Sequence, residues 1–67
     1  TLMHAAAFSG KKELVQLAYD LGLDINSRYG QDGVTPVDVG EDASEAMPLL
    51  ESLGGRRGWE LGRLPAK

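Results

Sequence analysis

The side chains that could take part in catalysis or phosphate binding are few in this chain and lack the spacing that such sites require. His4 is the single histidine, and no carboxylate or thiol stands at a spacing that would make it a general base or a metal ligand. Ser9-Gly10-Lys11 superficially suggests a phosphate-binding loop, but the full glycine pattern and its preceding strand are absent. We therefore expect His4 to be structural and Ser9-Gly10-Lys11 to form a turn between helices.

Acidic residues are concentrated between positions 38 and 45, where they suggest a cation site. The group Asp38, Glu41, Asp42 and Glu45 lacks the alternating acidic loop of a calcium site. We expect a solvated terminal face, with a surface for a basic partner as the alternative.

The chain has no cysteine, which excludes disulfides, thiolate zinc sites and cysteine nucleophiles. Because no nucleophile, base and orienting group form a recognisable set, we expect neither an enzyme nor a bound metal or cofactor.

The C-terminal segment carries one large aromatic residue among glycines and arginines. Trp59 suits an anchor in a partner's pocket; the alternative is that it folds back onto the last helix and shields Leu50 and Leu53. Phosphate contacts by the arginines and stacking by Trp59 would fit nucleic acid. Four cations on a chain of net charge −3 support that ligand weakly, and we do not expect nucleic acid as the partner. The partner-binding candidates in this segment are Arg56, Arg57, Trp59, Leu61 and Leu64.

Two short sequence motifs that begin with threonine mark the starts of the helices that position these residues. Thr1-Leu2-Met3-His4 is restated 34 positions later as Thr35-Pro36-Val37-Asp38. Threonine can cap a helix through its hydroxyl, and proline suits the first helical position, so the phrases predict helix starts. Gly10 then allows a reversal of direction, and Lys11 to Leu21 resumes a helical pattern. Its apolar residues share one face, which we expect to be buried: Leu14, Leu17, Ala18 and Leu21, with Val15 beside them.

The connection and the second unit are also marked in the sequence. Gly22 is the expected left-handed stop of the helix, and Asp32-Gly33 predicts a tight turn. The second helix recurs at an offset of 32, with residues 46–54 matching residues 14–22. Pro48 lies near the start of this helix, where the N–H that proline lacks has little to bond to. The sequence therefore predicts two helix pairs joined by a hairpin, with the second pair shortened.

This order of motifs resembles the ankyrin repeat, and the resemblance covers roughly residues 1–55. It implies an all-α fold of ankyrin-type helix-turn-helix repeats with a short hairpin-like loop between them. Asp38 stands where the repeat has histidine and Gly40 where it has alanine, as expected of an eroded terminal repeat. The matching residues are Thr1, Met3, His4, Ala6, Ala7, Gly10, Leu14, Val15, Leu17, Gly22, Asp24, Asn26, Asp32, Gly33, Thr35 and Pro36.

The resemblance divides the chain into three parts. Residues 1–34 form one repeat without its preceding hairpin, residues 35–55 a degenerate C-terminal capping repeat, and residues 56–67 a basic tail. The family implies a non-catalytic protein–protein interaction module that presents a rigid surface to a partner protein. The alternative is a small structural or peripheral subunit of a larger complex, anchored by its tail. The contact candidates that the resemblance implies are Phe8, Ser9, Tyr29, Gln31 and Asp32.

Size and charge suggest that the chain packs against further protein, either more repeats or a partner. Repeat arrays usually need about three units for stability, whereas 67 residues provide one full and one short unit. Because the chain begins in the middle of a repeat, we expect more repeats or a partner to cover the edge formed by residues 5–7, and the isolated chain to fold poorly. Net charge is −5 over residues 35–53 and +3 over residues 54–67. This division favours either a tail that folds back or docking on separate partner surfaces.

No apolar run approaches the ~20 residues that span a bilayer, and no targeting peptide stands at the start of the sequence. We expect an intracellular protein, or an organellar one if a targeting segment before Thr1 has been removed.

Overall fold

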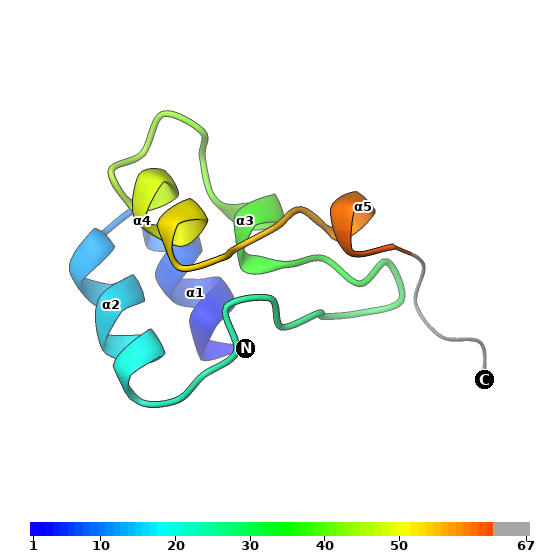
Figure 1. The fold of residues 1–67 in the computed structure, drawn as a ribbon, viewed down its shortest axis with the longest axis horizontal. Coiled ribbons are helices and arrows are strands. Elements are labelled where there is room, and N and C mark those ends of the chain that lie inside the picture. Colours follow the sequence, from blue (N-terminus) through cyan, green and yellow to red (C-terminus); the bar gives the residue numbers. More distant parts are fainter. Residues whose placement is uncertain (63–67) are drawn as a thin grey trace.

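The computed structural model describes residues 1–62, and within this range the protein is helical, without strands. Helices account for 52% of these residues, so the all-α prediction is confirmed. Two helix pairs lie side by side, because α1 packs against α2 and α3 while α2 packs against α4 (Figure 1). The helices are α1 (Leu2–Ser9), α2 (Lys12–Asp20), α3 (Pro36–Val39), α4 (Ala46–Ser52) and α5 (Gly58–Leu61).

Threonine caps begin both helix pairs, as predicted. The Thr1 hydroxyl accepts a hydrogen bond of 3.3 Å from the backbone N–H of His4. The Thr35 hydroxyl accepts one of 3.2 Å from Asp38, whose carboxylate in turn accepts one of 3.0 Å from the Thr35 N–H. This reciprocal capping box satisfies two donors that the helix leaves free. Gly10 ends α1 with a φ of 75°, which a residue with a side chain rarely adopts.

The two pairs share one hydrophobic core. Each of its ten apolar residues is less than 9% exposed, and both pairs and the connection between them contribute to it. Small side chains in α1 let its neighbours approach closely, since Ala7 is fully buried. The core residues are Met3, Ala6, Ala7, Val15, Ala18, Ile25, Val37, Ala46, Met47 and Leu50.

The expected burial of the whole apolar face of α2 is wrong. Val15 and Ala18 are buried, but Leu14, Leu17 and Leu21 are 43%, 56% and 65% exposed. Helical periodicity correctly places these residues on neighbouring strips of the helix surface. The physical reason for the error is that the side of α2 that meets α1 and α4 is narrower than the apolar face.

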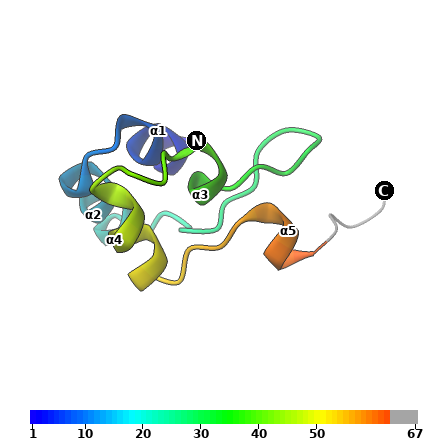
Figure 2. The same cartoon turned by 90° about the horizontal axis from the view of Figure 1, so that it is seen from above.

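The connection between the pairs extends away from the helices and returns through a short hairpin. Tyr29 and Val34 exchange two backbone hydrogen bonds of 2.9 and 3.1 Å. The turn between them is closed by a bond of 3.2 Å from the N–H of Gly33 to the carbonyl of Gly30, which confirms the predicted turn. The hairpin and α5 lie together on the side of the molecule away from α2 and α4 (Figures 1 and 2).

Candidate interaction surfaces

An apolar groove between α1 and α2 is open to solvent. Its volume is about 150 Å³. Leucines of α2 form one wall, and Leu2 with Ala5 of α1 forms the other. Because every lining side chain is apolar, the groove can bury apolar groups of a ligand. Its side chains offer no hydrogen bond or charge to a polar group. The residues of this apolar groove are Leu2, Ala5, Ala6, Leu14, Leu17, Ala18 and Leu21.

His4 fixes the hairpin to the start of α1. Its Nε2 donates a hydrogen bond of 2.7 Å to the carbonyl of Val34, and Nδ1 lies 2.5 Å from the Thr1 hydroxyl. With Nε2 protonated, Nδ1 is the acceptor of the hydroxyl proton. The rings of His4 and Tyr29 also lie against each other, with centroids 5.9 Å apart. The link between this histidine and a turn, which the resemblance implies, is therefore present, and both ring nitrogens are engaged.

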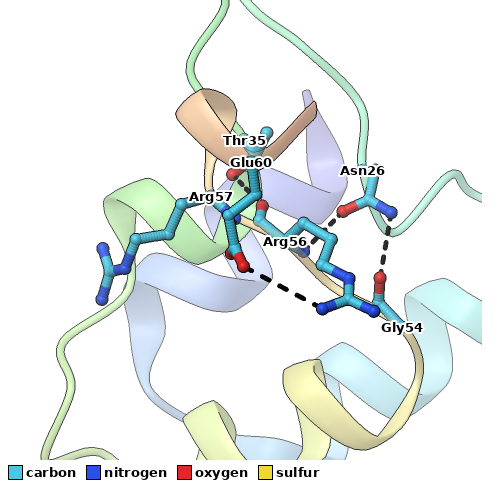
Figure 3. Close-up of polar contacts among 6 residues, drawn as sticks. All are labelled: Asn26, Thr35, Gly54, Arg56, Arg57 and Glu60. Atoms are coloured by element: carbon cyan, nitrogen blue, oxygen red, sulfur yellow. Dashed lines mark hydrogen bonds and ion pairs between the residues drawn. The ribbon is translucent and has the colours of Figure 1, made fainter. Parts of the chain in front are cut away.

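The segment after α4 folds back along the connection between the pairs. The Asn26 side chain donates to the Gly54 carbonyl at 3.0 Å and accepts from the Arg56 N–H at 2.7 Å (Figure 3). The buried hydroxyl of Thr35 donates a bond of 2.7 Å to the Arg56 carbonyl. Gly55 is buried between these contacts. Of the two arrangements that the charge division favours, folding back is thus the one that residues 54–58 adopt.

Asp38 holds the start of α5. Its carboxylate accepts a hydrogen bond of 2.9 Å from the Gly58 N–H in addition to the cap bond from Thr35. Partial burial by itself would raise the pKa of Asp38, but these backbone hydrogen bonds and the nearby Arg57 cation outweigh it and lower the pKa below its ordinary value. The carboxylate is therefore held in its charged form at neutral pH.

Two tail arginines among the described residues, Arg56 and Arg57, contact acidic side chains of the same chain. Arg57 forms an ion pair with Asp42, which belongs to the acidic cluster between α3 and α4. Arg56 lies 3.9 Å from Glu60, one turn ahead of it (Figure 3). Both pairs are exposed, so each contributes little to stability. They do place these two positive charges beside negative ones.

Five of the predicted contact residues are exposed on the hairpin and on α5. Tyr29 is 62%, Trp59 78% and Leu61 39% exposed. The hairpin and α5 are joined by Arg28, which donates to the carbonyls of Gly33 at 3.1 Å and Gly58 at 2.8 Å. Trp59 leaves most of its side chain in solvent, whereas Leu50 is fully buried and Leu53 half-buried. We call this set the tip surface: Tyr29, Gln31, Asp32, Trp59 and Leu61.

The remaining candidates lie elsewhere. Phe8 is 74% exposed at the end of α1 away from the hairpin. Beside it, the Ser9 hydroxyl donates to the Ala6 carbonyl at 2.6 Å and accepts from the Lys11 N–H at 3.1 Å, so it shapes the turn. Arg56 and Arg57 lie in the segment that folds back, and Leu64 lies outside the described residues.

Sequence reasoning missed three contributors to these surfaces. Nothing in the pattern indicates that Arg28 joins the hairpin to α5, or that Leu2 lines a groove. Asn26 belongs to the ankyrin-like motif, but its contacts are with residues 28 and 30 positions away. Only a signal that pairs distant positions would have revealed them.

In residues 1–62, no three His, Cys, Asp or Glu side chains gather where they could hold a metal ion. The helices described here all lack the combined length and apolar character of a membrane span. Comparisons with protein-family models, with curated proteins and with solved structures give no match for this chain.

Proposed function

We propose that the chain is a non-catalytic protein–protein interaction module of the ankyrin-repeat type, which presents its tip surface to a partner protein. The observation that carries this proposal is the exposure of Tyr29 and Trp59, 62% and 78%, on backbone held by hydrogen bonds. Removing large aromatic side chains from water into an interface is favourable, in proportion to the apolar area buried. Tyrosine and tryptophan are among the residues that most often dominate binding interfaces.

The order of elements supports the ankyrin type. A helix pair, a hairpin and a second helix pair follow one another, and Thr1 and Thr35 cap equivalent helices. His4 ties the first pair to the hairpin. Since both nitrogens of that ring are engaged, it serves packing rather than acid–base chemistry.

The alternative is a peripheral subunit of a larger complex, attached through α5. Trp59 favours it, because the side chain is exposed instead of packed on α4. Leu61 beside it is 39% exposed and enlarges the apolar area that a pocket could receive. In this alternative the hairpin is a scaffold and the contact is made by α5.

Contact of the basic tail with nucleic acid is not part of this proposal. Arg57 faces Asp42, and Arg56 faces Glu60, so phosphate would compete with carboxylates of the same chain. A direct contact with RNA or DNA would weaken steeply as salt rises from about 50 to 200 mM.

Affinity purification of the tagged full chain from its native source, with quantitative mass spectrometry, tests the proposal. Tyr29→Ala with Asp32→Ala should lower recovery of the partner roughly tenfold or more. Tyr19→Ala with Asp20→Ala is the matched control, because these residues are the same types and exposed on α2. Unchanged recovery with the hairpin pair would remove the proposal.

Trp59→Ala with Leu61→Ala separates the two functions, since loss with this pair alone supports attachment through α5. Deleting everything from Gly55 onward is a poorer test. Gly55 is buried and Arg56 accepts a hydrogen bond from Thr35, so that deletion also removes contacts that stabilise the fold.

A further inference from the structure

The backbone of Gly58, the first residue of α5, is held on both sides by charged side chains that are distant in the sequence. Its N–H donates a hydrogen bond of 2.9 Å to the carboxylate of Asp38. Its carbonyl accepts one of 2.8 Å from Nη2 of Arg28. Hydrogen bonds with one ionised partner are roughly twice as strong as neutral ones. The start of α5 is thus fixed between an anion of α3 and a cation beside the hairpin.

This close approach requires glycine at position 58. A Cβ there would lie 3.0 Å from Oδ2 of Asp38, 3.2 Å from the carbonyl oxygen of Gly33 and 3.4 Å from Nη2 of Arg28. A methyl group would therefore push α5 away from the atoms that hold it.

Arg28 connects two segments with two different nitrogen atoms. Its Nε donates a bond of 3.1 Å to the carbonyl of Gly33 within the hairpin, and its Nη2 donates the bond to Gly58. Because the guanidinium is planar and its donors have fixed directions, the two bonds fix the position of one segment relative to the other. A lysine has only one nitrogen atom, at the end of a flexible stem, and cannot impose this geometry.

The side chains of α5 do little to hold it in place. None of its four residues is buried. The ion pair of Arg57 with Asp42 is exposed and therefore weak. Trp59 and Leu61 are thus positioned by the backbone contacts of the residues before them, and their own apolar surfaces stay free for a partner.

We propose that Arg28 is the positioning residue of the tip surface: it fixes Trp59 relative to Tyr29, so that one apolar surface of a single protein partner contacts both. Arg28 acts through its bonds to Gly33 and Gly58 and needs no contact with the partner. This inference rests on the proposed function and deepens it, because the hairpin and α5 become two halves of one binding site.

Arg28→Ala in the tagged full chain tests the inference. It should lower recovery of the partner roughly tenfold, although every residue of the tip surface is kept, because binding must then order α5 against the hairpin. Arg28→Lys keeps the charge but not the two directed bonds, so its recovery should lie within about threefold of that of Arg28→Ala. Arg57→Ala is the matched control. It removes a cation one residue from Gly58 without altering the link to the hairpin, and recovery should change less than about twofold.

The fluorescence of Trp59, the single tryptophan, reports the positioning directly and without a partner. In time-resolved anisotropy, Arg28→Ala should add local motion of the indole on the nanosecond timescale, whereas Arg57→Ala should not. Gly58→Ala keeps both charged side chains but displaces α5, so it should act like Arg28→Ala in both measurements. Should Arg28→Ala unfold the chain, Arg28→Lys and Gly58→Ala provide the same test.

Full recovery of the partner with Arg28→Lys would overturn the inference, because the charge alone would then suffice. The inference also requires that Tyr29→Ala with Asp32→Ala and Trp59→Ala with Leu61→Ala each lower recovery. If the hairpin pair lowers recovery and Arg28→Ala does not, the inference fails and the proposed function stands. If the hairpin pair leaves recovery unchanged, the proposed function itself fails.

Discussion

The carboxylate of Asp38 accepts a hydrogen bond of 2.9 Å from the backbone N–H of Gly58, 20 residues along the chain. At the matching position of the first unit, His4 donates to the carbonyl of Val34. Both residues tie the start of a helix to the next connecting segment, but the direction of donation is reversed, because an ionised carboxylate only accepts. The departure from the repeat pattern at position 38 therefore has a structural role.

Replacing Asp38 with alanine should destabilise the start of α3 and the start of α5. The variant loses half of the capping box and the bond to Gly58, and we expect the free energy of unfolding to fall by about 1–2 kcal/mol. Urea denaturation measures the loss, and faster amide exchange at Gly58 would locate it. Asp32→Ala is the control, since Asp32 is exposed at the hairpin. An unchanged midpoint for Asp38→Ala would contradict the role.

The same carboxylate predicts how stability depends on pH. Its pKa in the folded protein lies below the ordinary value of 3.8. The contribution of the charged form is therefore complete above that value and is lost as pH falls through the lowered pKa. Between about pH 5 and pH 2.5, the unfolding midpoint of Asp38→Asn should fall less than that of the unaltered chain. Identical pH slopes would count against this assignment.

Removing the two threonine caps should lower the free energy of unfolding by different amounts. Thr35 is fully buried, and Thr35→Val leaves the Arg56 carbonyl and the Asp38 N–H without their partner. We expect a loss of about 2–3 kcal/mol in urea denaturation. Thr1→Val removes the equivalent cap and the bond to Nδ1 of His4, at an exposed position, and should cost less, about 1 kcal/mol. Equal costs would show that the bond to the returning segment adds nothing.

Gly55 is predicted to tolerate no side chain. A Cβ at this position would lie 2.6 Å from the Leu50 carbonyl oxygen and 2.8 Å from Cγ2 of Val37. Gly55→Ala should therefore lower the free energy of unfolding by about 1–3 kcal/mol through overpacking. Gly40→Ala is the matched control, because its nearest contact is the flexible end of Met47 at 3.2 Å. A thermal melt that ranks Gly40→Ala as the more damaging change would refute this prediction.

Features set by neighbouring residues were predictable from the sequence. The caps at Thr1 and Thr35 each depend on a side chain and the backbone within four positions of it, and the turns at Gly10 and Gly33 depend on backbone hydrogen bonds to residues three positions earlier. Such local preferences operate whatever the rest of the chain does.

Features set by distant contacts were not predictable. Periodicity shows that Leu14 and Leu17 share a helix face, but burial depends on whether another helix lies over that face. The position of Trp59 likewise depends on Asp38 and Arg28, which hold Gly58 from 20 and 30 residues away. For the interaction surfaces, the sequence therefore supplied the candidate residues, and the long-range hydrogen bonds decided which of them lie together.

The link between His4 and the hairpin also affects how a partner would be bound. A loop that is mobile before binding loses conformational entropy when it becomes ordered against a partner, and that loss weakens the affinity. Here the backbone beside Tyr29 is already fixed by the bond from His4 to Val34, and the Tyr29 ring lies tilted against the His4 ring. The conformational entropy of the hairpin is thus lost during folding and not on binding. Less of the favourable free energy from contacts made by Tyr29 is then offset by ordering the loop.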